Sequence, residues 1–230
     1  MKKLFVFVFT AVTLLSCSDD DSDNNGNLGL PTVSSSVPVY QNLKVEYNDT
    51  KKQTDVSANF LKSNAEGAYI SLSAPSSVMF NNQQPSFSTD EPYLYTATFS
   101  GEKEVTFTLT RRQGEVYTNT VTPDEYAFPE IVGLDAISLQ SGTFFVWMGK
   151  AVGEGEMVEV RIKTDAQEYT FQATEAGSIG VEIKFPSTAK AGEAEFYVSR
   201  IQTKDLQQDD KGAGGEITVV YTNEQEITLD

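Results

Sequence analysis

Apolar and polar residues alternate one by one through most of this chain, and this pattern limits its fold more than any other feature. Residues 43–47 read LKVEY and residues 158–162 read VEVRI, with the apolar side chains two positions apart. A period of two is typical of a half-buried β-strand, whose successive side chains point to opposite faces. The 3.6-residue period of a long amphipathic helix is absent. The sequence therefore predicts an all-β protein.

Strand-like segments bounded by turn residues recur in both halves of the chain. We expect strands at residues 43–47, 70–72, 93–99, 105–109, 116–121, 144–148, 158–162, 169–171, 181–185, 194–198, 217–221 and 227–229. Turns at Ser100–Lys103 and Arg112–Gly114 predict two successive hairpins over residues 93–121. The segment FFVWM (144–148) is apolar throughout, which predicts a central strand with both faces covered.

The segment TPDEYAFPEIVG (122–133) interrupts the alternation with two prolines, so we place a domain boundary near Phe128. About six strands on each side of it match the spacing of a β-sandwich. The sequence therefore predicts two tandem Ig-like β-sandwich domains, residues 38–128 and 129–230. Neither has the Cys…Trp…Cys pattern of antibody domains.

The N-terminus carries an export signal. Two lysines precede the apolar run LFVFVFTAVTLL, which is shorter than the roughly 20 residues that span a bilayer. The segment LLSC (14–17) resembles the lipobox of bacterial lipoproteins. The resemblance implies removal of residues 1–16, a diacylglycerol thioether on Cys17 and acylation of its new amino group. Cys17 is the only cysteine in the chain.

An acidic segment follows the cysteine. Its carboxylates are Asp19, Asp20, Asp21 and Asp23. Like charges repel one another and keep such a segment solvated, so we expect residues 17–37 to form a disordered tether. The segment also resembles the surface-export signal of Bacteroidetes lipoproteins. This implies a lipid-anchored protein on the outer face of the outer membrane.

Composition excludes several kinds of chemistry. The chain has no histidine, and its one cysteine is assigned to the lipid, so His- or Cys-based nucleophilic catalysis and His/Cys zinc sites are excluded. A net charge of −16, with no basic stripe, argues against binding to nucleic acid. We expect no catalytic residues, no metal and no cofactor.

Three longer motifs carry a wider resemblance. They are TLTRRQGEVYTNTVTPDEYAFPE, GTFFVWMG, and FYVSRIQTKDLQQDDKGAGGEITVVY. Together they resemble uncharacterised Bacteroidetes surface lipoproteins with tandem Ig-like β-sandwich domains, over most of residues 36–230. The resemblance implies architecture and location, and brings no known activity.

Two features could carry a site. Trp147, the only tryptophan, either packs in the core or stacks on a sugar, and its apolar strand favours the core. The segment 202–215 is predicted to be an exposed, mobile interaction loop. This segment contains Asp205, Asp209 and Asp210, and Glu216 follows it directly. They fail the calcium-loop pattern at the third and sixth positions, so we expect no calcium there.

The remaining charged candidates are interpreted as surface groups. Glu102 with Glu104 and Glu154 with Glu156 are carboxylate pairs of the kind that glycosidases use, but their turn positions favour simple turn charges. Arg111 and Arg112 lie at a hairpin turn and are expected to be solvated.

Taken together, these patterns favour a non-catalytic, surface-exposed lipoprotein that acts as a binding module for a glycan or a protein partner. An alternative is a glycan-binding accessory protein of an outer-membrane uptake system. A small carboxylate-based glycosidase and a fimbrial or adhesive subunit with an exchangeable terminal strand are less favoured alternatives.

Overall fold

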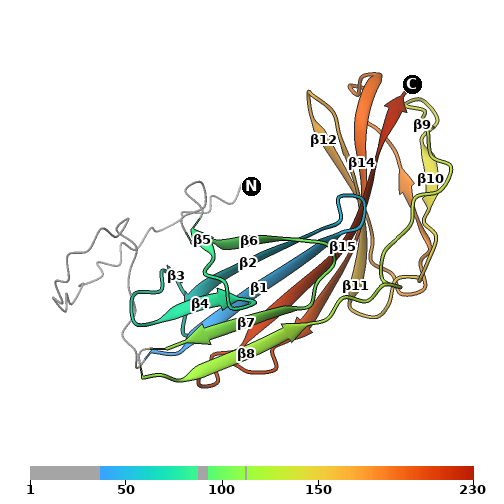
Figure 1. Cartoon of the computed structure of the whole chain (residues 1–230). Coiled ribbons are helices and arrows are strands. Elements are labelled where there is room, and N and C mark those ends of the chain that lie inside the picture. The colour runs from blue at the N-terminus through green and yellow to red at the C-terminus, as the bar shows by residue number, and fades with distance from the viewer. Residues whose placement is uncertain (1–36, 88–92, 112) are drawn as a thin grey trace, which may run out of the picture.

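A computed structural model describes residues 37–87, 93–111 and 113–230 (Figure 1). Every regular element in these ranges is a strand, which confirms the all-β prediction. The described residues contain no helix that is long and apolar enough to cross a membrane. The predicted signal peptide, Cys17 and the acidic residues Asp19, Asp20, Asp21 and Asp23 lie outside the described residues.

The strands follow one another along the chain, with short connections between them. They are β1 (Val39–Asn48), β2 (Gln53–Lys62), β3 (Tyr69–Ile70), β4 (Ser77–Phe80), β5 (Ser86–Phe87), β6 (Tyr95–Ser100), β7 (Val105–Thr110), β8 (Val116–Val121), β9 (Ala136–Ile137), β10 (Thr143–Val146), β11 (Glu156–Lys163), β12 (Glu168–Ala173), β13 (Gly180–Ile183), β14 (Gly192–Asp205) and β15 (Gly215–Leu229).

One large mixed sheet organises these strands. Its order is β12-β11-β14-β15-β1-β2-β6-β5, with β3 also paired to β2 and β9 to β15. The β1–β15 and β9–β15 pairings are parallel and the others in this sheet are antiparallel. Two smaller sheets, β4-β7-β8 and β10-β13, complete the fold.

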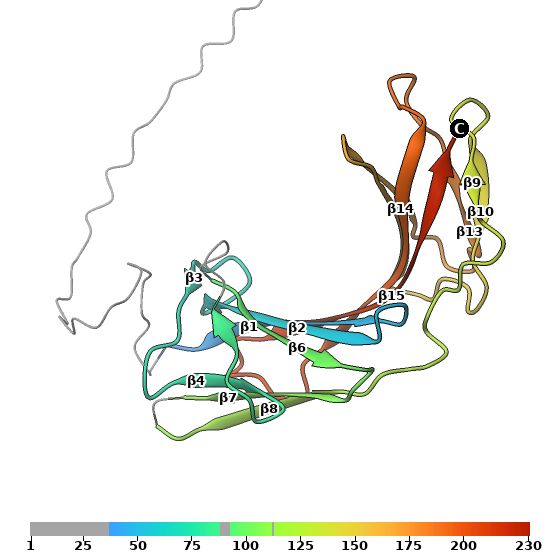
Figure 2. The same cartoon turned by 45° about the horizontal axis from the view of Figure 1, so that its top comes forward.

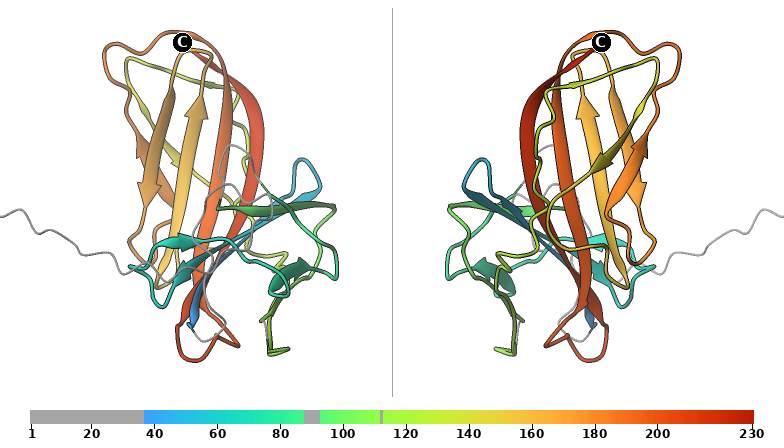
Figure 3. Two further views of the ribbon diagram at one scale, coloured as in Figure 1. Left: turned by 90° about the vertical axis from the view of Figure 1, so that its left-hand side faces the viewer. Right: turned by 90° about the vertical axis from the view of Figure 1, so that its right-hand side faces the viewer.

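The large sheet bends along β14 and β15, which gives the molecule an L shape (Figure 2). In the N-terminal arm, β1, β2 and β6 face the sheet β4-β7-β8. In the C-terminal arm, β11 and the far end of β14 face the sheet β10-β13 (Figures 1 and 2). From the open side of the bend, β11, β14 and β15 stand side by side above the N-terminal arm (Figure 3, left).

Each arm has its own apolar core, and β15 supplies both. Ile217, Val219 and Tyr221 pack in the N-terminal core, whereas Ile227 and Leu229 pack in the C-terminal core. All five alternate along β15 with outward-facing residues, so both cores lie on the same face of the large sheet. The predicted division of the chain at Phe128 into two domains stays a prediction. One large sheet runs through both arms, and its strand β15 contributes to both cores.

The bend encloses a buried arginine. Arg200 of β14 donates from Nε to the carbonyl of Ala127 (3.0 Å) and from Nη1 to that of Ala151 (3.1 Å). Its Nη1 also lies 2.6 Å from Oε2 of Glu156, and its Nη2 donates to the carbonyl of Lys150. A buried guanidinium requires such partners because desolvation of an unpaired charge is costly. Arg200 thereby ties the chain between the two arms to β14.

Strand pairing differs from the prediction for β6. The β7–β8 hairpin is confirmed, but β6 pairs with β2 and β5 instead of β7, so the first predicted hairpin is wrong. The turn after β6 carries the chain from the large sheet to the small one. The structure also adds β2, β4, β5 and β9, and it joins the predicted strands 217–221 and 227–229 into the single strand β15.

The prediction for residues 144–148 is wrong as well. Strand β10 belongs to a two-stranded sheet, and only Phe145 and Trp147 face the core. Phe144, 63% exposed, points outward together with Val146 and Met148. The Phe144 ring lies against Gly180 of β13, where a Cβ would approach the ring to 2.6 Å. An outward apolar stripe made this strand resemble one that is covered on both faces.

Candidate functional site

The face of the large sheet that looks into the bend is polar and is covered by neither small sheet (Figure 2). Strand alternation places these side chains there, because every second residue faces away from the cores. We call this surface the concave face. It includes Asn42, Lys44, Glu46, Asp55, Ser57, Asn59, Thr96, Thr98, Glu159, Arg161, Lys163, Gln172, Glu195, Tyr197, Glu224 and Glu226.

At the bend, five side chains of this face form what we call the corner cluster: Lys51, Arg161, Glu195, Tyr197 and Glu224. Strand register aligns Arg161 with Tyr197 and Tyr197 with Glu224 on three neighbouring strands, and such partners share a face. The guanidinium carbon of Arg161 lies 4.7 Å from the centroid of the Tyr197 ring. Lys51 reaches in from the β1–β2 turn, with its Nζ 2.9 Å from Oε2 of Glu224 and 6.0 Å from the ring centroid.

The tyrosine hydroxyl of this cluster is a fixed donor. Tyr197 donates to Oε2 of Glu195 at 2.7 Å. Burial and this hydrogen bond raise the pKa of Tyr197 to about 12, whereas the same bond, with Lys163 nearby, lowers the pKa of Glu195. At neutral pH the phenol is therefore protonated and the carboxylate is ionised. The cluster presents a positioned cation and a positioned anion side by side.

Two hollows lie on the concave face, one on each arm. The hollow on the C-terminal arm has a volume of about 460 Å³ and is lined by Lys163, Thr164, Asp165, Glu193, Ala194, Glu195 and Glu226. The other, of about 160 Å³, is lined by Lys44, Glu46, Asp55, Val56, Ser57, Thr96, Ala97 and Thr98. The corner cluster contributes Glu195 to the larger hollow, and both hollows open on the same polar surface.

The far end of the N-terminal arm adds an aromatic surface to this face. Leu61 is the register partner of both Tyr40 and Tyr69, so these three side chains share the concave face. Tyr69 is 44% exposed, and its ring centroid lies 5.1 Å from that of Tyr93. An exposed aromatic ring offers an apolar face to a ligand.

Tyr69, Arg161 and Tyr197 were not among the candidate residues predicted from the sequence. The sequence does indicate that Tyr197 and Arg161 face outward, because each alternates with apolar residues that face the core. What the sequence lacked was the strand register that brings Tyr197 beside Arg161 and Glu224.

The loop predicted at 202–215 is shorter than expected, although Gln207, Gln208, Lys211 and Gly212 within it are exposed as predicted. Strand β14 extends to Asp205 and β15 begins at Gly215, so the connection covers only residues 206–214. Gln207 and Gln208 bind the edge of β8, where their side-chain oxygens accept the amides of Thr120 (2.9 Å) and Thr118 (2.8 Å). The connection is therefore docked along β8.

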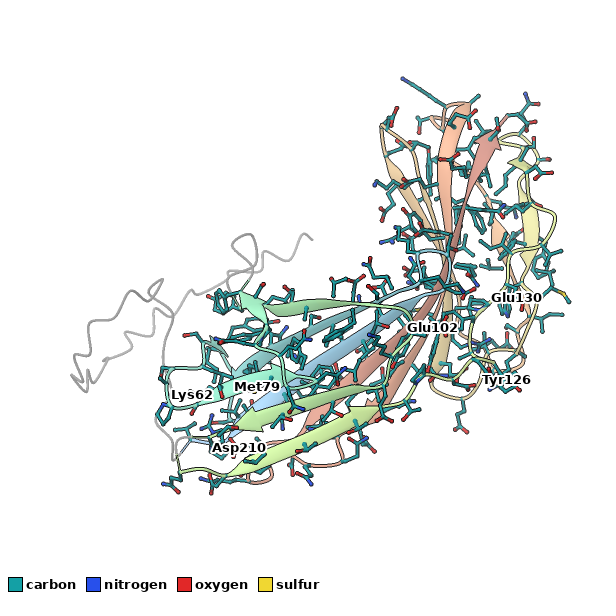
Figure 4. The ribbon with its side chains drawn as sticks, in the orientation of Figure 1. Lys62, Met79, Glu102, Tyr126, Glu130 and Asp210 are labelled. Carbon is teal, nitrogen blue, oxygen red and sulfur yellow. The ribbon has the colours of Figure 1, made fainter. Side chains whose placement is uncertain are left out.

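The same connection contains a buried ion pair. Asp210 is fully buried, with Oδ2 3.1 Å from Nε of Arg111 and accepting the amide of Val39 at 3.0 Å. The expectation of a solvated Arg111 is therefore wrong, because its counter-ion comes from a distant part of the chain; Arg112 lies outside the described residues. Asp210 lies at the far end of the N-terminal arm (Figure 4). Burial and the Asp210 carboxylate raise the pKa of Tyr117 to about 12.

The other predicted residues have clear positions. Trp147 is 2% exposed, which confirms its place in the core, and its Nε1 donates to the carbonyl of Lys150 at 3.0 Å. Asp209 accepts the amide of Gly214. Within the described ranges, no group of three carboxylates, histidines or cysteines is arranged to hold a metal ion.

The two carboxylate pairs have separate partners. Glu104 accepts the hydroxyl of Thr122, whereas Glu156 binds Arg200 and the side-chain amide of Gln202. Glu156 is therefore part of the bend and is not a simple turn charge. Glu102 does have a carboxylate neighbour: burial and a hydrogen bond with Asp49 raise its pKa, and Nζ of Lys52 lies 4.0 Å from its Oε1.

No protein-family model and no curated protein matches this chain. Among solved structures, the chain aligns with SGBP-B of the Bacteroides ovatus mixed-linkage glucan utilization locus, solved in complex with a mixed-linkage heptasaccharide. The two are 10% identical, and the alignment covers 77% of this chain and 53% of that chain with a TM-score of 0.24. The chain thus spans about half the length of that protein.

Proposed function

We propose that this protein is a non-catalytic binding module of the outer-membrane surface, and that its concave face binds a glycan chain. Cys17 is the proposed lipid anchor, and the acidic residues after it are the proposed export address. The observation that carries the proposal is the polar concave face, which is continuous across both arms, holds two hollows and ends at the exposed ring of Tyr69.

The chemistry of this face suits a sugar polymer. Each sugar hydroxyl donates and accepts hydrogen bonds, so it fits a surface that mixes amides, hydroxyls, carboxylates and cations. The apolar face of a sugar ring fits an exposed aromatic side chain such as Tyr69. The outward side of β1 runs from Tyr40 to Asn48, a length of roughly 26 Å at 3.3 Å per residue. A rigid platform of this length favours an extended polymer over a small molecule.

The carboxylates of the concave face favour binding over hydrolysis. Asp55 accepts hydrogen bonds from Gln53 (2.7 Å) and Thr98 (2.6 Å), and Glu224 is paired with Lys51. A glycosidase requires a carboxylic acid with a raised pKa opposite a second carboxylate. Glu195, which lines the larger hollow, has a lowered pKa instead. Glu102 has a raised pKa and a carboxylate partner, Asp49, but neither residue lines either hollow.

The position of the last strand favours a binding module over an adhesive subunit that exchanges its terminal strand. In the large sheet, β15 lies between β14 and β1 and supplies residues to both cores. Exchange of this strand would disrupt both arms. A terminal strand suited to exchange would lie at a sheet edge, where it could leave without opening the core.

We expect Tyr69→Ala to weaken glycan binding about tenfold, which corresponds to about 1.4 kcal/mol. The substitution removes an exposed ring and leaves the cores unchanged, so the melting temperature should not move. Titration calorimetry with a panel of neutral and acidic polysaccharides would first identify the ligand and then measure the loss. The matched control is Tyr126→Ala, which removes an exposed ring on the other side of the bend (Figure 4). Equal affinity of the two variants would contradict the proposed surface.

We expect Cys17→Ser to release the protein from membranes or to leave its signal peptide uncleaved. Lipidation requires the thiol, and Cys17 is the only cysteine in the chain. Anchoring by two or more acyl chains is firm, whereas loss of all chains removes it. Metabolic labelling with a fatty-acid analogue, followed by fractionation, measures the effect. Label on the Cys17→Ser variant would overturn this assignment.

A further inference from the structure

Arg161 differs from the lysines of the concave face in its partners. Lys44 pairs with Glu46 at 2.9 Å, Lys51 with Glu224 at 2.9 Å, and Lys163 with Glu195 at 3.4 Å. Among the ion pairs of the described residues, none includes Arg161, whose charged group lies over the Tyr197 ring instead. Stacking on a ring satisfies the face of a guanidinium and leaves its N–H donors at the edge. These donors are therefore available to an acceptor group of a ligand.

Tyr197 holds a donor and an acceptor in fixed positions. Its ring lies against Arg161, and its hydroxyl donates to Glu195. All three residues lie on the paired central strands β11 and β14, where side-chain positions are more precise than on loops. Preorganised groups lose little conformational freedom when a ligand binds. Tyr197 thus acts as a positioning residue for both charged groups.

Adjacent hydroxyl groups of a sugar match this arrangement. One hydroxyl can accept from Arg161 while its neighbour donates to Glu195, since every hydroxyl has both capacities. Acidic sugars match it poorly, because three carboxylates share this face, namely Glu195, Glu224 and Glu226. Among the described residues of the face, Arg161 is the one cation without an ion pair, since the lysines there are already paired. The overall charge of −16 adds long-range repulsion of anionic polymers.

We infer that the corner cluster is a specificity site that binds vicinal hydroxyls of an uncharged glycan and excludes acidic glycans. This inference rests on the proposed function and adds to it the class of ligand and the residues that select it. Arg161 contacts the sugar directly, and Tyr197 positions Arg161 and Glu195. The site lies at the bend, where a chain bound along the N-terminal arm would reach the larger hollow.

The test compares two forms of one polymer, using the neutral polysaccharide identified by titration calorimetry and the same polysaccharide oxidised to its uronic acid. We expect the neutral form to bind with an affinity that changes less than about twofold between about 50 and about 500 mM sodium chloride. The oxidised form should bind at least about tenfold more weakly. A charged ligand held by lysines would show the opposite ranking and a strong dependence on salt.

Substitutions in the cluster then locate the selection. Arg161→Gln and Arg161→Lys should each weaken binding of the neutral form about tenfold, because lysine keeps the charge but loses the planar fork. Tyr197→Phe keeps the ring beneath Arg161 and frees Glu195, so a smaller loss of about threefold is expected. The control is Lys184→Gln, which removes an exposed cation next to Glu182 on the other side of the arm. All variants should melt within a few degrees of the parent.

The outcomes separate this inference from the proposed function. Two results would overturn the corner cluster as the specificity site and leave the proposed function standing. One is preferential binding of the oxidised form. The other is unchanged affinity in both Arg161 variants while Tyr69→Ala still weakens binding. Absence of binding to every polysaccharide of the panel overturns both.

Discussion

Asp210→Ala is expected to lower the free energy of unfolding by about 3–5 kcal/mol, as breaking a buried ion pair usually does. The substitution leaves the guanidinium of Arg111 buried without its counter-ion, which lies 3.1 Å away in the native protein. It also removes the acceptor of the Val39 amide at the start of β1. Urea denaturation monitored by tryptophan fluorescence measures the loss as a shift of the midpoint.

Two further variants make this prediction specific. Asp205→Ala removes an exposed carboxylate at the end of β14, and it should change stability by no more than about 0.5 kcal/mol. The double variant Arg111→Met with Asp210→Ala should be less destabilised than the sum of its single variants, because the second change removes the unpaired charge. An Asp210→Ala variant as stable as Asp205→Ala would contradict the buried ion pair.

The ion pair matters for function because of where it lies. Arg111 also donates from Nη2 to the carbonyl of Val37 at 2.8 Å, so β7, the 206–214 connection and the start of β1 meet at this point. If Cys17 carries the proposed lipid anchor, any pull on the protein would reach the fold at this end. The contacts of Arg111 and Asp210 with Val37 and Val39 hold the start of β1 there.

Where apolar and polar residues alternate strictly, the sequence was sufficient to predict which side chains face the cores. Leu43 and Val45 are buried as their period-two spacing indicates, and so are Val158, Val160 and Ile162. The reason is physical, since a strand has two faces and the apolar one turns away from water. The burial of Trp147 was predicted for another reason, an apolar strand covered on both faces, and the residue is buried although only one face of that strand is covered.

Strand partners could not be predicted in this way. The residues of β6 and β7 alternate like those of a hairpin, yet β6 pairs with β2 across the large sheet. Likewise, nothing local shows that β15 lies parallel to β1, from Gln41 beside Gly215 to Asn48 beside Thr222. Alternation assigns a side chain to a face and carries no information on which strand lies beside it.

Buried charges were the second failure. Arg111 and Asp210 were expected at the surface because an isolated charge is costly to bury, and nothing in the sequence singled out Arg200. Each is buried beside partners far away in the sequence, which only the tertiary structure reveals. The concave face depends on the same long-range pairing, since Arg161 and Tyr197 become neighbours only when β11 pairs with β14.

Trp147→Ala is expected to destabilise the protein by about 3–5 kcal/mol, as the truncation of a buried aromatic side chain usually does. The ring packs in the C-terminal core with Phe145, and its N–H binds the carbonyl of Lys150, which also accepts from Arg200. Truncation therefore opens a cavity beside the contacts that hold the bend. Because Trp147 is the only tryptophan, this variant must be followed by circular dichroism, with Met148→Ala, the exposed neighbouring residue, as the control of small effect. In the parent protein we expect blue-shifted emission and poor quenching by acrylamide. Two results would place the ring at the surface and make it a candidate sugar-stacking residue again. One is red-shifted, readily quenched emission of the parent protein. The other is an unfolding midpoint of Trp147→Ala equal to that of Met148→Ala.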